Sequence, residues 1–226
     1  MLNGSDVVSQ PMFVFFVFAT ILLSLGYFRG RRKNQRIVAT ALKSLSAVFE
    51  PKDQQFTNIG GLTGYHANII PKKNRFIKRV DATITLLPRH SWLYLPVSRM
   101  IRKFDRMFMV WHLTGKCSKA LVEGHLIEAG YSRMAGARIL NLDILEKEPL
   151  TWGGKTFFLY SQTPEIRESL LICKEKLGEP GTVRHIALVP EQERVFVFMI
   201  PKLGTVQPTV QIIFDWFVAF MEKATR

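Results

Sequence analysis

The sequence is poor in cysteine and has no histidine arrangement typical of a metal site. The 226 residues include two cysteines, Cys117 and Cys173, which form no CxxC pair. We expect free thiols in a reducing compartment, because small secreted domains that depend on disulfides use many more cysteines. The five histidines form no HExxH motif and lie at no ligand spacing from the cysteines. The sequence therefore predicts no metal site.

The sequence also lacks the motifs of the common catalytic sites. It contains no GxGxxG, GxxxxGK[ST] or GxSxG motif and no kinase signature. The glycine-rich stretch at 60–64 follows a linker and is better explained as a turn. Residue type alone would allow Cys117 to act as a nucleophile with His112 or His125 as its base. We therefore predict a protein that is not an enzyme and needs no cofactor.

Acidic residues are scarce in the first half of the chain. Residues 29–116 contain 18 Lys and Arg but only four Asp and Glu, whereas residues 117–226 contain 13 of each. The net charge of +13 therefore comes from one block. Such a block predicts a polyanionic neighbour, either phospholipid headgroups or nucleic acid. Solubility together with the orientation of a membrane helix is the simpler explanation.

Charge is absent altogether from one apolar stretch near the N-terminus. No charged residue occurs from Val7 to Phe28, and residues 11–28 are mostly Phe, Val, Leu and Ile. A helix needs about 20 such residues to cross a bilayer, so we predict a transmembrane helix at 11–28. A cleaved signal peptide would need a basic start and a small-residue cleavage site, and neither is present. Four basic residues follow directly: Arg29, Arg31, Arg32 and Lys33. They predict that residues 1–10 lie outside or in the lumen and that the rest is cytosolic.

The remainder of the chain has the mixed patterns of an α+β domain. Helices are predicted at 34–50, 164–177 and 208–224, and strands at 65–70, 76–87, 155–160, 183–188 and 194–200. We expect mixed but mainly antiparallel strands with helices packed on one face. The predicted division is a short extracytosolic segment at 1–10, the span at 11–28, a basic juxtamembrane segment and helix at 29–58, and a cytosolic domain at 59–226. Residues 51–64 are expected to be mostly linker.

Residues 91–113 are the most unusual part of the body. Trp92 and Tyr94 lie in an aromatic, apolar run that precedes a series of basic residues. These are spaced i, i+3, i+4 and i+7 from Arg99 to Arg106, which would place them on one face of a helix. A cationic amphipathic helix of this kind lies in a lipid interface or presents its charges to phosphates. A helix packed in the core with a solvated basic face fits the same pattern.

Two groups of basic residues are the candidate ribosome- or phosphate-binding residues. The hairpin group is Lys72, Lys73, Arg75, Lys78 and Arg79, and the helix group is Arg99, Arg102, Lys103 and Arg106. Both would contact ribosomal RNA phosphates or acidic headgroups, through contacts that weaken steeply with salt. The candidate membrane-interface residues are Trp92, Tyr94, Arg29, Arg31, Arg32 and Lys33.

The order of these parts resembles the calumin family, coiled-coil-domain proteins of the endoplasmic reticulum membrane. The resemblance is carried by the run Gly30-Arg31-Arg32-Lys33-Asn34-Gln35 directly after the span. At the other end it is carried by the strand at 195–201 and by a helix that ends in Glu222-Lys223-Ala224. It covers most of residues 11–226 in order and pattern. The family's long acidic luminal region and long basic tail have no counterpart here, so the resemblance is to a short form.

The resemblance implies a role in the biogenesis of membrane proteins. Members of the family work beside the Sec translocon and the ribosome with a small multi-span partner subunit, as an intramembrane chaperone complex. We therefore expect a non-enzymatic, single-pass protein that assists insertion and folding at the translocon, in the endoplasmic reticulum or, in a prokaryote, in the plasma membrane. The alternative is a membrane-surface protein that binds lipid or organises the membrane, with an anionic lipid surface as its partner.

Overall fold

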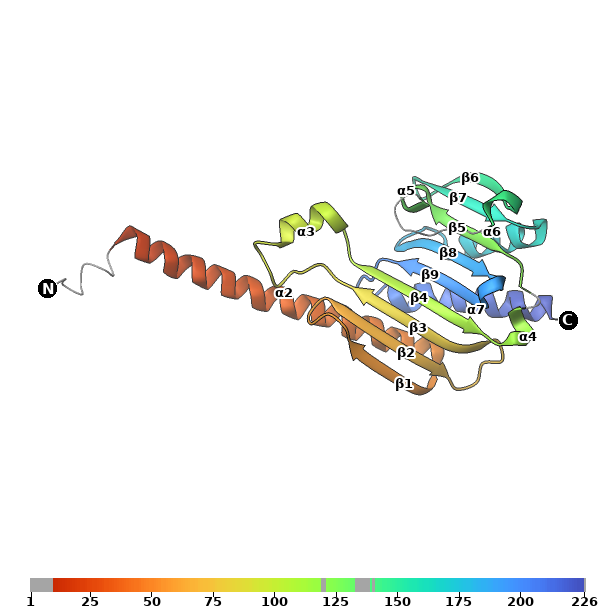
Figure 1. The fold of residues 1–226 in the computed structure, drawn as a ribbon, viewed down its shortest axis with the longest axis horizontal. Coiled ribbons are helices and arrows are strands. Elements are labelled where there is room, and N and C mark those ends of the chain that lie inside the picture. The colour runs from red at the N-terminus through yellow and green to blue at the C-terminus, as the bar shows by residue number, and fades with distance from the viewer. Residues whose placement is uncertain (1–9, 119–120, 133–138, 140, 226) are drawn as a thin grey trace.

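A single antiparallel sheet forms the body of the protein. The computed structural model describes residues 10–118, 121–132, 139 and 141–225, so the predicted segment 1–10 lies outside it except for Gln10. Nine strands pair in the order β1-β2-β3-β4-β9-β8-β5-β7-β6, and neighbouring strands are antiparallel (Figure 1). Together with the packed helices, this sheet confirms the predicted α+β class.

The elements have the following bounds. The strands are β1 (Pro51–Asn58), β2 (Gly64–Pro71), β3 (Ile77–Thr85), β4 (Arg106–Leu113), β5 (Gly124–Glu128), β6 (Glu146–Trp152), β7 (Lys155–Ser161), β8 (Val183–Val189) and β9 (Arg194–Met199). The longer helices are α2 (Pro11–Phe49), α3 (Leu95–Arg102), α6 (Pro164–Leu177) and α7 (Val206–Ala224). Short turns of helix are α4 (Gly115–Ser118), α5 (Ala129–Ser132), η1 (Leu142–Ile144) and η2 (Pro190–Gln192).

Helix α2 runs without a break from the apolar segment into the domain. Its 39 residues join the predicted span at 11–28 to the predicted helix at 34–50. The most apolar 18-residue window has a mean hydropathy of 2.1, and only 6% of that window is buried. A core helix would be mostly covered, so the first half of α2 fits a single membrane span by length and composition. In Figure 1 this half projects away from the domain.

One face of the sheet carries the hydrophobic core. The second half of α2, α7 and α6 cover this face, with α7 packed between the other two. Buried residues recur every three or four positions from Ile37 to Val48, which is the stripe that a helix presents to a core. Trp111 of β4 packs edge-on against Phe49 of α2 and Phe217 of α7. The juxtamembrane helix is therefore part of the domain's core.

The segment that follows α2 corrects one prediction. Residues 51–58, expected to be linker, form β1 at the edge of the sheet, and the predicted boundary after residue 58 separates no structural units because β1 pairs with β2. Seven of the eight residues of β1 are exposed. An edge strand with both faces solvated has no alternation of apolar and polar residues, which is the signal that identifies a strand in a sequence.

The predicted amphipathic helix is also shorter than its charge pattern suggests. Helix α3 ends at Arg102, and Lys103 has a positive φ of 55°. Arg106 opens β4, so it does not share a helix face with Arg99. The chain turns at this point because Asp105 is buried and hydrogen-bonded to neighbouring segments.

The domain has two ends along the strand direction. We call the end where α2 enters, between Gly26 and Asn34, the entry end. The opposite end, here the far end, contains the turn between β2 and β3, where the backbone N–H of Lys72 donates to the carbonyl of Glu50 at 3.0 Å. Helix α2 rises about 28 Å from Gly30 to Phe49 at roughly 1.5 Å per residue. This rise measures the separation of the two ends.

Candidate membrane-surface site

The loop that precedes α3 packs closely on α2 at the entry end. Gly26, Gly30 and Asn34 lie four residues apart and form one buried face of the helix. A Cβ on Gly26 would lie 2.6 Å from the ring of Trp92, and a Cβ on Gly30 would overlap the backbone of Arg89. Glycine at both positions is what lets the loop approach the helix this closely.

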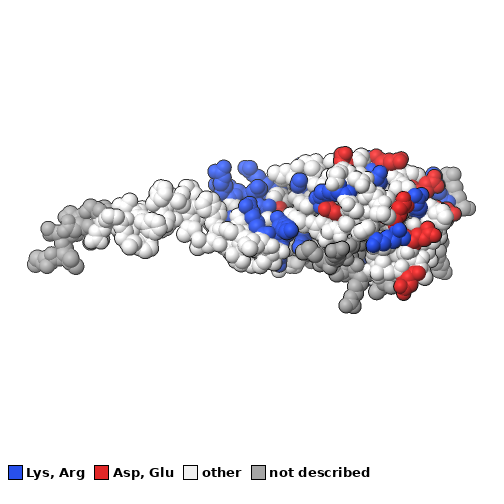
Figure 2. Space-filling view, turned by 90° about the horizontal axis from the view of Figure 1, so that it is seen from above, with Lys and Arg blue, Asp and Glu red and all other residues white. Residues whose placement is uncertain are grey.

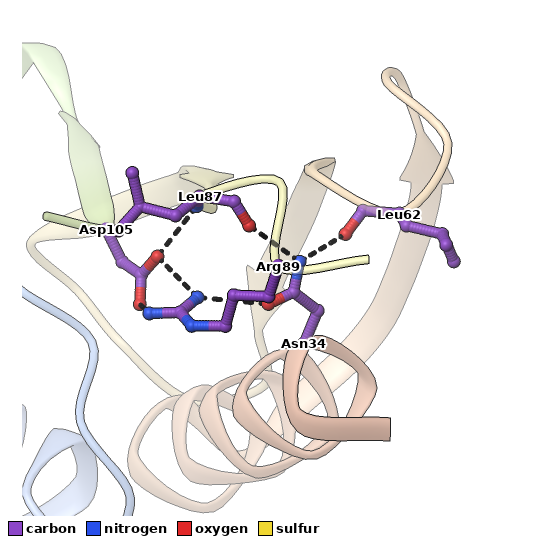
Figure 3. A network of polar contacts seen from close by, with 5 residues as sticks. All are labelled: Asn34, Leu62, Leu87, Arg89 and Asp105. Atoms are coloured by element: carbon purple, nitrogen blue, oxygen red, sulfur yellow. Dashed lines mark hydrogen bonds and ion pairs between the residues drawn. The ribbon is translucent and has the colours of Figure 1, made fainter. Parts of the chain in front are cut away.

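A buried polar network fixes this junction (Figure 3). Asn34 Nδ2 donates to the carbonyls of Leu62 at 3.0 Å and Leu87 at 2.9 Å. Arg89 donates through Nη1 to Asn34 Oδ1 at 3.0 Å and to Asp105 Oδ1 at 2.8 Å, and through Nη2 to Asp105 Oδ2 at 2.7 Å. Asp105 Oδ1 also accepts the backbone N–H of Leu87 at 2.8 Å. The network joins α2, the β1–β2 loop, the segment after β3 and the start of β4.

Helix α3 and the loop before it expose most of their apolar side chains instead of packing them. Leu93, Met100 and Ile101 are 80%, 83% and 63% exposed, and Ser98 is the buried residue of the helix. The two candidate interface aromatics, Trp92 and Tyr94, are each about half exposed, at 48% and 51%. The alternative of a core-packed helix is therefore wrong. An amphipathic helix with both faces open is the form that interfacial helices take.

Basic side chains gather around the entry end. Figure 2 shows Lys and Arg concentrated where the bare part of α2 meets the domain, whereas Lys, Arg, Asp and Glu are mixed over the rest of that face. The candidate residues that this end brings together are Arg29, Arg31, Arg32, Lys33, Arg99, Arg102 and Lys103, all of them exposed. Within the described residues, none of these seven makes an ion pair.

Arg106 also lies at this end but is only partly exposed. Its guanidinium lies 6.0 Å from the ring centroid of Phe104, and its Nε is buried without a hydrogen-bond partner. It lines a small cavity of about 330 Å³ beside Tyr131 and Phe198. Arg102 and Lys103 of the same predicted group also line this cavity, whereas Arg99 does not.

The hairpin group lies at the far end, separated from the helix group by the length of the domain. Lys72, Lys73 and Lys78 are exposed and make no ion pair within the described residues. Arg75 pairs with Glu222 of α7 at 3.3 Å, in contact with solvent. Arg79 pairs with Asp81 at 2.9 Å. The structure does not bring the two predicted basic groups into one surface.

A groove on the open face of the sheet is a feature that sequence reasoning missed. It has a volume of about 480 Å³ and is lined by apolar side chains of β4, β5, β8 and β9. At its base Glu123 Oε1 lies 3.1 Å from His125 Nε2, and His125 Nδ1 lies 3.3 Å from His185 Nε2. Burial lowers the pKa of His185 well below its usual value, and the hydrogen bond from His125 lowers the pKa of Glu123. The described lining residues include no Ser, Thr or Cys.

The other missed residues at the entry end are Asn34, Arg89, Asp105 and Lys202. The spacing of Gly26, Gly30 and Asn34 by four residues was the available signal, since small residues repeated on one face of a helix permit a close approach. The remaining partners come from distant parts of the sequence and share no motif. No group of three or more metal-ligating side chains is found among the described residues.

No family model matches the chain, and no curated protein has a significantly similar sequence.

Proposed function

We propose that this protein is a non-enzymatic, single-pass membrane factor that assists the insertion and folding of membrane proteins at the Sec translocon. Its α+β domain works in the cytosol, against the membrane surface. The observation that carries the proposal is the junction at the entry end, where an unbroken helix and a buried polar network fix the domain directly below the span. A domain on a flexible linker would have no such defined position.

The distribution of charge supports the cytosolic orientation and a contact with lipid at the entry end. Arg29, Arg31, Arg32 and Lys33 follow the span at once, and such clusters mark the cytoplasmic side of membrane helices. The helix group, with the exposed apolar side chains of α3, then lies at the level of the headgroups. We therefore assign Arg99, Arg102 and Lys103 to headgroup contact.

The hairpin group is placed for a different polyanion. Lys72, Lys73 and Lys78 lie about 28 Å further from the membrane along α2, beyond the reach of headgroups. Exposed lysines that make no ion pair within the described part of the chain are suited to the phosphates of ribosomal RNA. We propose that this end contacts a ribosome docked on the translocon, while a small multi-span partner subunit binds beside the span.

Co-sedimentation with ribosomes tests the proposal. The full chain, solubilised in mild detergent, is expected to sediment with ribosomes and translocon subunits at about 50 mM salt and to be released at several hundred millimolar, because phosphate contacts are lost steeply with salt. Lys72→Glu with Lys73→Glu should abolish sedimentation. Lys174→Glu with Lys176→Glu, the same charge change on α6, should not. Absence of the wild type from the ribosome pellet at both salts would refute direct ribosome contact.

A second candidate function is the organisation of lipid at the membrane surface. The exposure of Leu93, Met100 and Ile101 favours it, because a monomeric soluble domain seldom leaves such side chains open together. It predicts that Met100→Glu removes activity in a vesicle-remodelling assay but leaves ribosome binding intact. No effect of the wild type on vesicle size or lipid mixing would exclude this function.

A further inference from the structure

A third cavity opens between α2, α3 and the loop from β9 to α7. Its volume is about 500 Å³, and its walls come from four segments of the sequence, which are α2, the segment after β3, α3 with the turn that follows it, and the β9–α7 loop. Lys33 lines it from α2, Arg99 and Lys103 from α3 and its C-cap, and Lys202 from the β9–α7 loop. Four cationic side chains that converge on one concavity define a site for an anion.

One carboxylate, that of Asp105, occurs among the described residues that line this cavity, and it is already neutralised. Asp105 is held by Arg89 through two hydrogen bonds of 2.7 and 2.8 Å and is almost fully buried. The four other cations make no ion pair with any described residue. The cavity is therefore strongly positive and has no internal counter-ion among the residues that the structure describes.

The position of the cavity along α2 matches the depth of phospholipid headgroups. Lys33 lies five residues after Phe28, the last residue of the expected span, which is about 7.5 Å along a helix. The headgroup region of each leaflet extends roughly 5–8 Å beyond the hydrocarbon. Leu203 lines the cavity and is 53% exposed in the β9–α7 loop, and Met100, the neighbour of the lining residue Arg99 on α3, is 83% exposed. An anion in this cavity can thus carry acyl chains that stay in the bilayer.

We propose that this cavity binds the phosphate group of an anionic phospholipid from the leaflet next to the domain. Lys33, Arg99, Lys103 and Lys202 surround the headgroup, and Arg89 holds the wall in place through Asp105. The proposal rests on the placement of the domain at the membrane surface in the proposed function. It adds a defined lipid site where the basic surface alone would give only diffuse attraction.

Lipid retention by the full chain tests this site. The protein is purified in mild detergent, stripped of lipid, and mixed with micelles that contain dioleoyl phosphatidylglycerol or dioleoyl phosphatidylcholine. Bound lipids are counted by native mass spectrometry. The wild type should retain one phosphatidylglycerol and no phosphatidylcholine. Lys33→Gln with Lys202→Gln should lower the affinity about 30-fold, because each basic side chain near an anionic surface contributes roughly a factor of five.

The control pair is Lys72→Gln with Lys73→Gln, which removes the same charge at the far end. It should retain phosphatidylglycerol as the wild type does. Equal loss in both pairs would overturn the proposal in favour of general electrostatic attraction, and equal retention of the two lipids would overturn it as well. A third outcome is that the wild type retains no phosphatidylglycerol but binds inorganic phosphate or a single-stranded RNA. If Lys33→Gln with Lys202→Gln abolishes that binding, the cavity is a site for those anions and the lipid proposal is overturned.

Failure of this site and failure of the proposed function give different results. The lipid count does not depend on ribosomes or translocon, so a retained phosphatidylglycerol would stand even if ribosome sedimentation failed. Conversely, a wild type that sediments with ribosomes but retains no lipid would remove the lipid site and leave the translocon role untouched.

Discussion

The backbone carbonyl of Arg89 occupies the space that a side chain on Gly30 would need. The contact brings the loop before α3 directly onto the helix, and the side chain of the same arginine closes the polar network below it. One residue therefore contributes its backbone to packing and its side chain to charge pairing. The junction between span and domain depends on both contacts.

We predict that Gly30→Ala destabilises this junction. The added methyl group must displace backbone atoms, and overpacking of this kind costs about 1–3 kcal/mol. The midpoint of thermal unfolding of the detergent-solubilised full chain, followed by circular dichroism, should fall. Gly130→Ala is the control, because a Cβ there meets no atom within 4 Å. A stability of Gly30→Ala equal to that of Gly130→Ala would show that the loop does not pack as described.

The ion pair of Arg89 and Asp105 should contribute far more stability than a pair at the surface. Their side chains are only 15% and 6% exposed, so Arg89→Met leaves a buried carboxylate without its cation, at a cost of about 3–5 kcal/mol. Arg167→Met removes a pair of similar geometry with Glu148, in which both side chains are over 40% exposed, and should change the melting temperature little. Equal effects of the two substitutions in urea unfolding would contradict the buried network.

Stability should fall in mildly acidic solution because of His185. Burial lowers its pKa in the folded protein, whereas the unfolded chain titrates near 6.5. Below that pH the unfolded chain binds a proton that the folded chain excludes, so the free energy of unfolding falls by at most about 1.4 kcal/mol per pH unit from this group. His185→Gln should flatten the unfolding profile between pH 6.5 and 5. If the free energy of unfolding of the variant depends on pH as steeply as that of the wild type, the effect comes from other groups.

Trp92 should lie within reach of lipid acyl chains. Of the four tryptophans it alone is substantially exposed, while Trp111, Trp152 and Trp216 are buried in the domain. In liposomes with brominated phospholipids, quenching of the protein's fluorescence should come almost entirely from Trp92. Trp92→Phe should therefore remove the quenching, and Trp152→Phe should keep it. Quenching that survives Trp92→Phe would place the entry end away from the bilayer.

In the second half of the fold, α6, α7, β7, β8 and β9 were predictable because they have clear local signals, whereas β5 and β6 were not predicted. Pro164 at the start of α6 and Gly178 after its end are strong helix boundaries, and β9 is a short run of Val, Phe and Met that is typical of a buried strand. Prediction was wrong where the signal was missing or accidental. Strand β1 has no apolar face, and the spacing of basic residues from Arg99 to Arg106 continues a helical period past the real end of α3.

The candidate site was only partly accessible from sequence. The basic residues and the exposed aromatics could be identified from composition and spacing, and the structure places Trp92 and α3 beside the end of the span. The division of the basic residues into two distant groups could not be inferred, because it depends on the strand order of the sheet. The junction is built from Asn34, Arg89 and Asp105, which no local pattern links.

Because α2 is continuous, the tilt of the membrane span determines the orientation of the domain. Helix α2 has no proline after its first residue, and the loop before α3 packs on it where it enters the domain. It therefore has no hinge, and the domain must follow every change in the tilt of the span. Spans tilt more in thin membranes and less in thick ones. A change of roughly 10° would move the far end by about 5 Å over the 28 Å of helix inside the domain. Because this displacement is mostly parallel to the membrane plane, membrane thickness would set the lateral position of the lysines of the β2–β3 turn.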